Sequence, residues 1–128
     1  MDKEQYIKTE EGATAYFSDE AMTVLHREDG PAVEHDDGSK LWYINGVCHR
    51  DDGPAGEWYG GDKFWYINGK LHREGAPAVE WADGSREWYI DGKRHREDGP
   101  AMKWACNGEG WYFINGERVN EDGTPHSA

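Results

Sequence analysis

The sequence predicts an all-β fold, in which stacked two-stranded hairpin units form an elongated antiparallel β-meander or solenoid with a twisted open sheet. Two observations predict it. A 23-residue segment recurs along the 128-residue chain, and each copy carries the residue pairs of tight β-turns. We divide the chain into an N-terminal segment with a degenerate capping unit (1–23), the repeat array (24–123) and a C-terminal tail (124–128).

The repeat is visible in three nearly identical runs. WYINGVCHRDDGPA begins at Trp42, WYINGKLHREGAPA at Trp65 and WYIDGKRHREDGPA at Trp88. After Trp104 the step lengthens to 24 residues, because the loop 106–110 carries one extra residue. The first and last copies lack parts of the motif, which is typical of an array whose terminal units must present a hydrated face.

Two chain reversals define each unit. The first is an Asn-Gly or Asp-Gly pair that predicts a type I′ turn, with φ > 0 at both central residues, at 45–46, 68–69, 91–92 and 115–116. The second is a glycine-containing pair at 37–38, 60–61, 83–84 and 107–108. Two reversals allow two strands per unit, so we expect the HREDGPA segment to continue one bent strand around its proline. Each unit then lengthens the sheet by about 10 Å, and the array reaches on the order of 50 Å.

Aromatic side chains are expected to supply the core, because Leu, Ile and Val are few. The chain has seven Trp, seven Tyr and three Phe, and a buried ring hides roughly 150–250 Å². Strand alternation places Trp42 and Ile44 on one face and Tyr43 on the other, with the same pattern in each copy. We expect ladders of like rings to hold the units together rather than to form a ligand platform.

Charge and cysteine usage limit the function classes. The net charge of −12 argues against direct nucleic-acid binding. By itself it indicates a solvated acidic surface, and it also fits good solubility, a basic protein partner, or a surface that competes with nucleic acid for such a partner. Cys48 and Cys106 occupy different positions of the unit, so a bridge is not expected and a reducing compartment fits better. No apolar leader and no stretch of membrane-spanning length is present. We therefore expect a soluble cytoplasmic protein that does not bind membranes.

The composite unit WYINGKLHREDGPAVEWADGSRE resembles a MORN repeat over roughly residues 24–123. The matching residues, with their copies in other units, are Trp65, Asn68, Gly69, Lys70, His72, Asp83, Gly84 and Trp88. The H-G-x-G of that family is replaced by H-R-E-D-G-P-A, and short proteins with this variant are similar to ones from bacteriophages and large viruses. The resemblance implies an elongated β-ribbon with a binding function. MORN-type repeats usually act as protein–protein scaffolds, and lipid binding has been suggested for some.

Neither a metal site nor a catalytic site is predicted, and no cofactor is expected. Four histidines lie one unit apart, about 10 Å, which is too far for them to share one zinc ion without other ligands: His26, His49, His72 and His95. Cys48 and His49 are strand neighbours, so their side chains point to opposite faces and do not form a thiolate–imidazole pair. We expect no enzyme activity.

A row of arginines follows the histidines: Arg27, Arg50, Arg73 and Arg96. One interpretation is an anion site with aromatic rings nearby for stacking. The other, which we favour, is pairing within each unit, with the adjacent acids or with carbonyls that the proline bend frees. Gly75 removes one acid from the third copy, so Arg73 is expected to be the least neutralised.

Departures from the repeat are the best candidates for partner contacts. Trp111 stands where the previous unit has Glu87, and an apolar ring on a hydrophilic ribbon favours a binding site. The other candidates are Leu41 and Phe64 at the matching position, Tyr59, Phe17 in the acidic N-terminal segment, and Arg73.

These features predict a non-enzymatic binding protein that docks a host protein through an acidic β-repeat surface. In its sharpest form it is a phage-encoded inhibitor of a defence or nucleic-acid-binding complex, whose acidity imitates DNA. Two alternatives stay open. One is a protein that sequesters a nucleotide signal, and the other is a scaffold that self-assembles through its edge strands.

Overall fold

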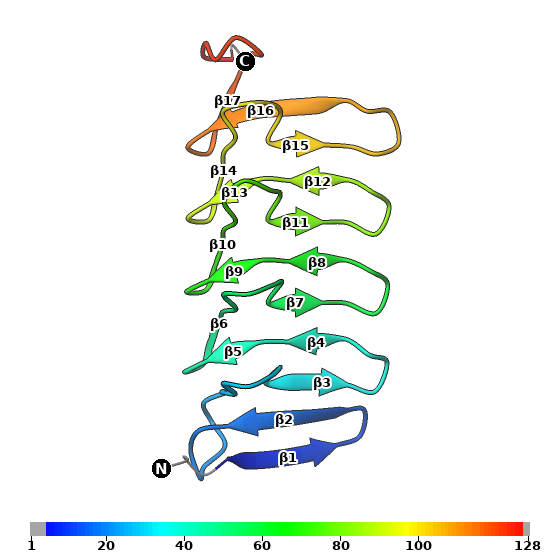
Figure 1. Ribbon diagram of the computed structural model, residues 1–128, viewed down its shortest axis with the longest axis vertical. Coiled ribbons are helices and arrows are strands. Elements are labelled where there is room, and N and C mark those ends of the chain that lie inside the picture. The colour runs from blue at the N-terminus through cyan, green and yellow to red at the C-terminus, as the bar shows by residue number, and fades with distance from the viewer. Residues whose placement is uncertain (1–4, 127–128) are drawn as a thin grey trace.

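The computed structural model describes residues 5–126, and every regular element within that range is a β-strand (Figure 1). The largest sheet is antiparallel and open, with eleven strands in the order β1-β2-β3-β4-β7-β8-β11-β12-β15-β16-β17. These strands are β1 (Tyr6–Glu10), β2 (Ala13–Phe17), β3 (Val33–His35), β4 (Lys40–Leu41), β7 (Gly56–Glu57), β8 (Lys63–Phe64), β11 (Val79–Glu80), β12 (Arg86–Glu87), β15 (Met102–Lys103), β16 (Gly110–Ile114) and β17 (Glu117–Val119).

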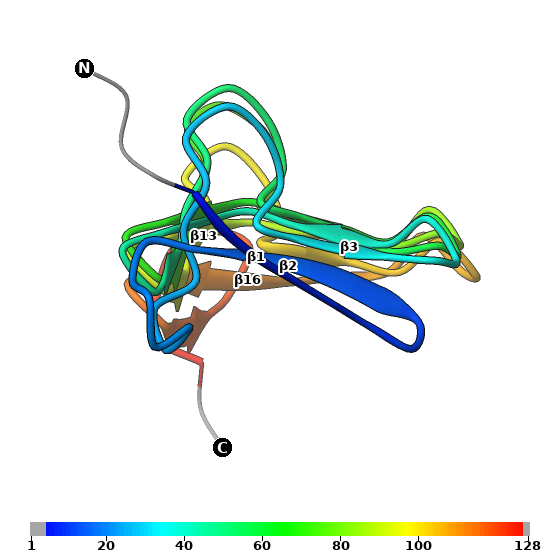
Figure 2. The same ribbon diagram turned by 90° about the horizontal axis from the view of Figure 1, so that it is seen from below.

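Three short hairpins stand beside this sheet as separate two-stranded sheets. They pair β5 (Tyr43–Ile44) with β6 (Val47–Cys48), β9 (Tyr66–Ile67) with β10 (Lys70–Leu71), and β13 (Tyr89–Ile90) with β14 (Lys93–Arg94). Seen along the long axis, successive copies superpose, and the main sheet is a single layer (Figure 2). The regular spacing of the sequence motif is therefore matched by a regular series of hairpins.

The hairpin turns confirm the first predicted reversal. Asn45 and Gly46 have φ values of 50° and 79°, and the three later pairs have nearly the same values, as a type I′ turn requires. The second reversal also lies where the glycine pairs predict it, between β3 and β4 and at its later equivalents.

The prediction for the HREDGPA segment is wrong. Strands β6 and β7 belong to different sheets, and residues 49–55 between them form a loop instead of one bent strand. This loop and its equivalents protrude together on one side of the sheet (Figure 2). Pro54 has no N–H for a ladder, and Arg50 folds back to bond the Pro54 carbonyl, so the backbone here closes on itself instead of pairing with a strand.

Consecutive units are joined by a repeated set of hydrogen bonds. The backbone N–H of Arg50 donates to the Tyr66 carbonyl at 3.1 Å, and that of Gly69 donates to the Cys48 carbonyl at 2.9 Å. The Asn68 N–H donates to Nδ1 of His49, also at 2.9 Å. Equivalent bonds reach His26, His72 and His95. The histidine row therefore links each unit to the turn of the next.

The fully buried residues are small, which differs from the aromatic core that the composition predicts. Ala32, Ala55, Ala78 and Ala101, each following a proline, are 0% exposed, whereas Phe113 is the only Phe, Tyr or Trp of the described residues that is buried. A single-layer sheet has no second layer to cover its rings. Most rings are therefore half-buried, and charged side chains cover some of them.

Candidate binding surfaces

Each protruding loop clamps one arginine against a ring. The Arg50 guanidinium lies 3.9 Å from the centroid of the Trp42 ring. Its Nη1 donates to the Pro54 carbonyl at 3.0 Å and to Glu57 at 3.1 Å, and its Nε donates to Asp52 at 3.0 Å. This is the within-unit pairing that the sequence favours, and it uses both predicted kinds of partner. The same stacking recurs for Arg27 on Tyr16, Arg73 on Trp65 and Arg96 on Trp88.

A glycine makes room for the clamped guanidinium. A Cβ at Gly53 would lie 2.9 Å from Cζ of Arg50, and the same approach occurs at Gly30 and Gly99. The third unit has Ala76 at this position and Gly75 one residue earlier, with φ of +77°. The backbone of that loop is therefore different, although Arg73 still lies 3.8 Å from the Trp65 ring.

Arg73 is less isolated than the sequence suggests. It lacks the acid replaced by Gly75, but its Nη1 donates to Glu80 at 2.9 Å and to the Pro77 carbonyl at 3.1 Å. Arg96 also keeps a single acidic partner, Asp98 at 3.0 Å, because Lys103 stands where the other units have glutamate. Arg73 and Arg96 each have one carboxylate partner.

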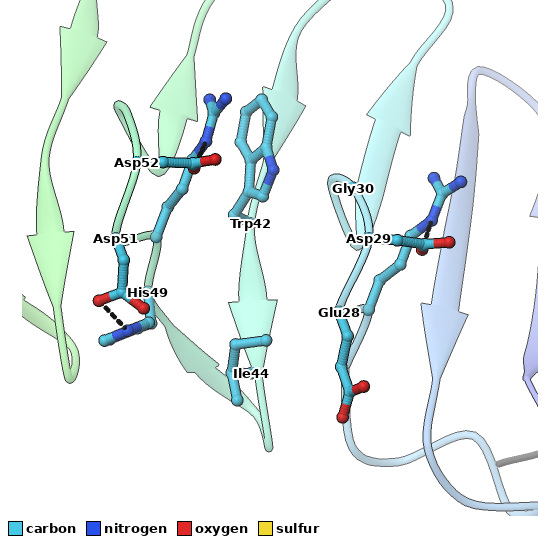
Figure 3. A pocket seen from close by; sticks show the side chains of 10 residues that line it. Glu28, Asp29, Gly30, Trp42, Ile44, His49, Asp51 and Asp52 are labelled. Carbon is cyan, nitrogen blue, oxygen red and sulfur yellow. Dashed lines mark hydrogen bonds and ion pairs between the residues drawn. The ribbon is translucent and has the colours of Figure 1, made fainter. Parts of the chain in front are cut away.

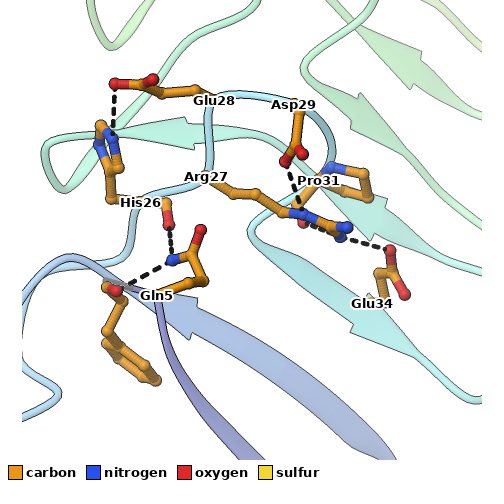
Figure 4. Close-up of polar contacts among 8 residues, drawn as sticks. Gln5, His26, Arg27, Glu28, Asp29, Pro31 and Glu34 are labelled. Carbon is orange, nitrogen blue, oxygen red and sulfur yellow. Dashed lines mark hydrogen bonds and ion pairs between the residues drawn. The ribbon is translucent and has the colours of Figure 1, made fainter. Parts of the chain in front are cut away.

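The loops present a row of carboxylates to solvent, which we call the loop ridge (loops 26–32, 49–55, 72–78 and 95–101). The Asp29, Asp52 and Asp98 side chains are each 87% exposed even though each pairs with an arginine. Beside them are the exposed acids Glu28, Asp51, Glu74 and Glu97. Figure 4 shows the first loop, where Glu28 contacts His26, and Gln5 donates to the His26 carbonyl.

Three cavities lie between successive loops of the ridge. The first, of 570 Å³, is lined by Trp42 and Ile44, by acids of both flanking loops and by the clamped Arg27 and Arg50 (Figure 3). The second, of 500 Å³, repeats this lining around Trp65 and Ile67, and the third, of 430 Å³, around Trp88 and Ile90. We call them the first, second and third niches.

The opposite face of the sheet is more apolar. Directly paired residues share a face, and one such row crosses nine strands: Ala15, Val33, Leu41, Gly56, Phe64, Val79, Glu87, Met102 and Trp111. Phe17, two residues beyond Ala15, also lies on this face. The structure thus brings four predicted contact residues, Leu41, Phe64, Trp111 and Phe17, to one face, whereas Arg73 lies on the loop face.

Among the predicted contact residues, two are strongly exposed. Tyr59 is 77% exposed in the turn before β8, and Trp111 is 41% exposed. The Trp111 ring is nevertheless supported, with Trp104 edge-on at 5.2 Å and the Arg118 guanidinium at 3.9 Å. Phe64 packs edge-on against Trp81 at 5.4 Å.

Glu87 is a buried acid that the sequence analysis did not single out. Its side chain is 11% exposed and accepts hydrogen bonds from the Trp81 indole at 2.7 Å and the Tyr89 hydroxyl at 2.9 Å, with Arg94 at 3.5 Å. Burial, and then the bond to Glu87, raise the pKa of Tyr89 to about 12. The only signal in the sequence was an acid at a position that is apolar in the other units.

The two cysteines differ in exposure, since Cys48 is half-buried and Cys106 is exposed. Both thiols are free, and burial raises the pKa of Cys48 to about 11, which keeps it protonated and a poor nucleophile. Among residues 5–126, no group of three or more His, Cys, Asp or Glu residues is arranged to hold a metal ion. That same range contains no helix long and apolar enough to cross a bilayer.

The chain was compared with protein-family models, with curated proteins and with solved structures, and none of the three comparisons gave a match.

Proposed function

We propose that the chain is a non-enzymatic binding protein with a MORN-like repeat architecture, and that its loop ridge docks a basic surface of a host protein. In its most specific form the proposal is a phage-encoded inhibitor that acts in the cytoplasm on a defence or nucleic-acid-binding protein. Repeated sequence motifs that recur as repeated hairpins support the architecture, and the H-R-x-D-G-P-A variant supports the viral source.

One observation carries the docking proposal. The loops protrude on one side of the molecule (Figure 2), and their aspartates that pair with arginine remain exposed. Exposed ion pairs of this kind add little to stability, about 0–1 kcal/mol each. A row of like charge does attract an oppositely charged partner and speeds its encounter.

The test compares two neutralised variants in affinity capture from a bacterial lysate, followed by binding to the purified captured protein. The ridge variant carries Asp51→Asn, Asp52→Asn and Glu97→Gln, and the control carries Glu11→Gln, Glu20→Gln and Glu121→Gln. We expect the ridge variant to lose at least tenfold in affinity, and added salt to weaken wild-type binding. Equal binding by both variants, or binding insensitive to salt, would contradict the proposal.

The two alternatives receive different support. A nucleotide-sequestering protein needs free guanidinium donors, yet Nη1 of Arg27, Arg50 and Arg73 already bonds both a carbonyl and a carboxylate. Self-assembly is favoured by one specific feature, since β1 is the outermost strand of an open sheet and its Ile7 is half exposed. Light scattering checks self-assembly, because a strict monomer at high concentration contradicts it.

A further inference from the structure

Each niche is bounded by a tryptophan that already holds one cation. In the first niche, Arg50 covers one side of Trp42 at 3.9 Å, and Trp42 stands between that arginine and the acidic loop of the preceding unit (Figure 3). The cavity lies between the Trp42 ring and that acidic loop. Arg50 therefore covers one side of the Trp42 ring, and a ligand can reach the ring from the niche on the other side.

The four loop arginines, which stack on aromatic rings beside carboxylates, indicate the kind of ligand that a niche would bind. The guanidinium groups of the four loop arginines each stack on a ring at 3.8–3.9 Å, and three of them have a loop aspartate on Nε at 3.0–3.3 Å. An indole face with carboxylates at its edge favours a planar or compact cation, worth about 0.5–1 kcal/mol at an exposed site. A second cation entering the niche would again meet an indole and carboxylates, whereas the arginines that also line the niches are already paired with carboxylates.

The spacing of the niches selects the kind of partner. Successive niches are one unit apart, which is two strands of about 4.8 Å, or roughly 10 Å. Three residues of a polyproline II helix span nearly the same distance, at about 3.1 Å each, and complete one turn. A polypeptide lying along the ridge in this conformation would therefore point every third side chain toward a niche.

This inference rests on the proposed function: we propose that the three niches bind arginine or lysine side chains at every third position of a partner segment in the polyproline II conformation. The carboxylates that line each niche rank the three sites. The first niche has four of them, Glu28, Asp29, Asp51 and Asp52; the second has Asp51, Asp52 and Glu74; and the third has Glu97 and Asp98. Two loop arginines also line each niche, so the acids outnumber the arginines by two in the first niche and by one in the second, and equal them in the third. Binding is therefore strongest at the N-terminal end of the row.

The test uses fluorescence anisotropy with two labelled peptides of equal charge. One consists of three Arg-Gly-Gly repeats, and the other carries the same residues with the arginines adjacent. We expect the spaced peptide to bind about tenfold more tightly, because it places one cation in each niche while the clustered peptide does not.

Two matched variants test the ranking. Glu28→Gln/Asp29→Asn removes two carboxylates from the first niche, and Glu97→Gln/Asp98→Asn removes two from the third. The first pair should weaken the spaced peptide severalfold more than the second, and Glu11→Gln/Glu20→Gln, which neutralises two exposed acids elsewhere, should leave binding within twofold of wild type.

Three results would overturn the inference. Equal affinity for the two peptides, with salt-sensitive binding of both, would mean that the acidic ridge binds basic chains without distinguishing the spacing of their arginines. Spermine binding as tightly as the spaced peptide would make the occupant a small polyamine. Failure of both peptides, with ridge-dependent capture of a folded protein intact, would refute the niches alone, whereas loss of ridge dependence in that capture would refute the proposed function.

Discussion

The arginine clamp shows how single residues set the shape of each loop. Arg50 is held by the Trp42 ring, the Pro54 carbonyl and two carboxylates, and Gly53 leaves the space in which its guanidinium lies. Cation–π contact and charge-assisted hydrogen bonds reinforce each other here. The Arg50 side chain therefore helps to set the conformation of the loop, together with Pro54.

Gly53→Ala should destabilise the protein by about 1–2 kcal/mol, since the new Cβ would push the guanidinium off the Trp42 ring. The double change Asp52→Gly/Gly53→Ala copies the Gly75-Ala76 sequence of the third unit and should recover much of the loss. Urea unfolding of both variants measures the difference. A double variant no more stable than the single one would contradict this account of the glycine.

Tyr89 and Glu87 predict a pH effect. Burial first, and then the hydrogen bond to Glu87, raise the pKa of Tyr89 to about 12, above its unfolded value of about 10. The resulting stability is fully present below pH 10 and is lost as pH rises toward 12. Glu87→Gln should lower the pKa of Tyr89, as followed by NMR titration of labelled tyrosines. Tyr43, whose pKa is raised mainly by burial, is the control and should not change.

Only some of these side-chain contacts could be predicted from the sequence. Pairing of Arg50 with Asp52 and with a loop carbonyl was predictable because the partners are close in sequence. Glu57 and Glu80 were not, since they reach their arginines only once the loop has folded back. The burial of Glu87 depends on Trp81, Tyr89 and Arg94 meeting on one face, which one unit cannot reveal.

At the scale of the elements, the histidine row holds neighbouring units in register. Nδ1 of each histidine accepts the first N–H of the next hairpin turn. That contact sets Nε2 as the protonated nitrogen of the neutral ring, able to donate to a nearby acid such as Asp51. The histidine row therefore has a structural role, and its 23-residue spacing is that of the units it joins.

His26→Ala should therefore cost about 1–3 kcal/mol, because it leaves the Asn45 N–H without its acceptor and removes a buried ring. His126→Ala, at an exposed position near the end of the described chain, is the matched control. Thermal unfolding compares the two. A loss at His26 no greater than at His126 would show that the histidine is not a link between units.

The sequence predicted the turns of these elements better than the segments between them. Asn-Gly and Asp-Gly pairs have few backbone options, so Asn45-Gly46 and its copies were predictable. The loop 49–55 was not predictable in this way. Counting chain reversals gives the number of strands per unit, but it cannot detect a loop that leaves the strand direction unchanged. Hairpin β1–β2 also lies in a region with no repeat signal, although it extends the main sheet.

The whole molecule has two unlike faces. One carries the loop ridge and its three niches, and the other carries the apolar row with Trp111 and Phe64. Sequence reasoning predicted an acidic surface and several exposed rings, but it did not assign them to opposite sides. That separation needs the register of the whole sheet, which fixes the side of every strand residue at once.

The loop face is the proposed partner-binding face, and the seven tryptophan indoles of the chain report directly on whether a ligand binds there. Trp42, Trp65 and Trp88 line the niches, whereas Trp58, Trp81, Trp104 and Trp111 do not line them. Their indole N–H signals should be followed by NMR while the spaced arginine peptide is added at low and at high salt. We predict that the three niche signals shift, the Trp42 signal first, and that high salt suppresses the shifts. Shifts confined to the other four tryptophans would contradict the claim.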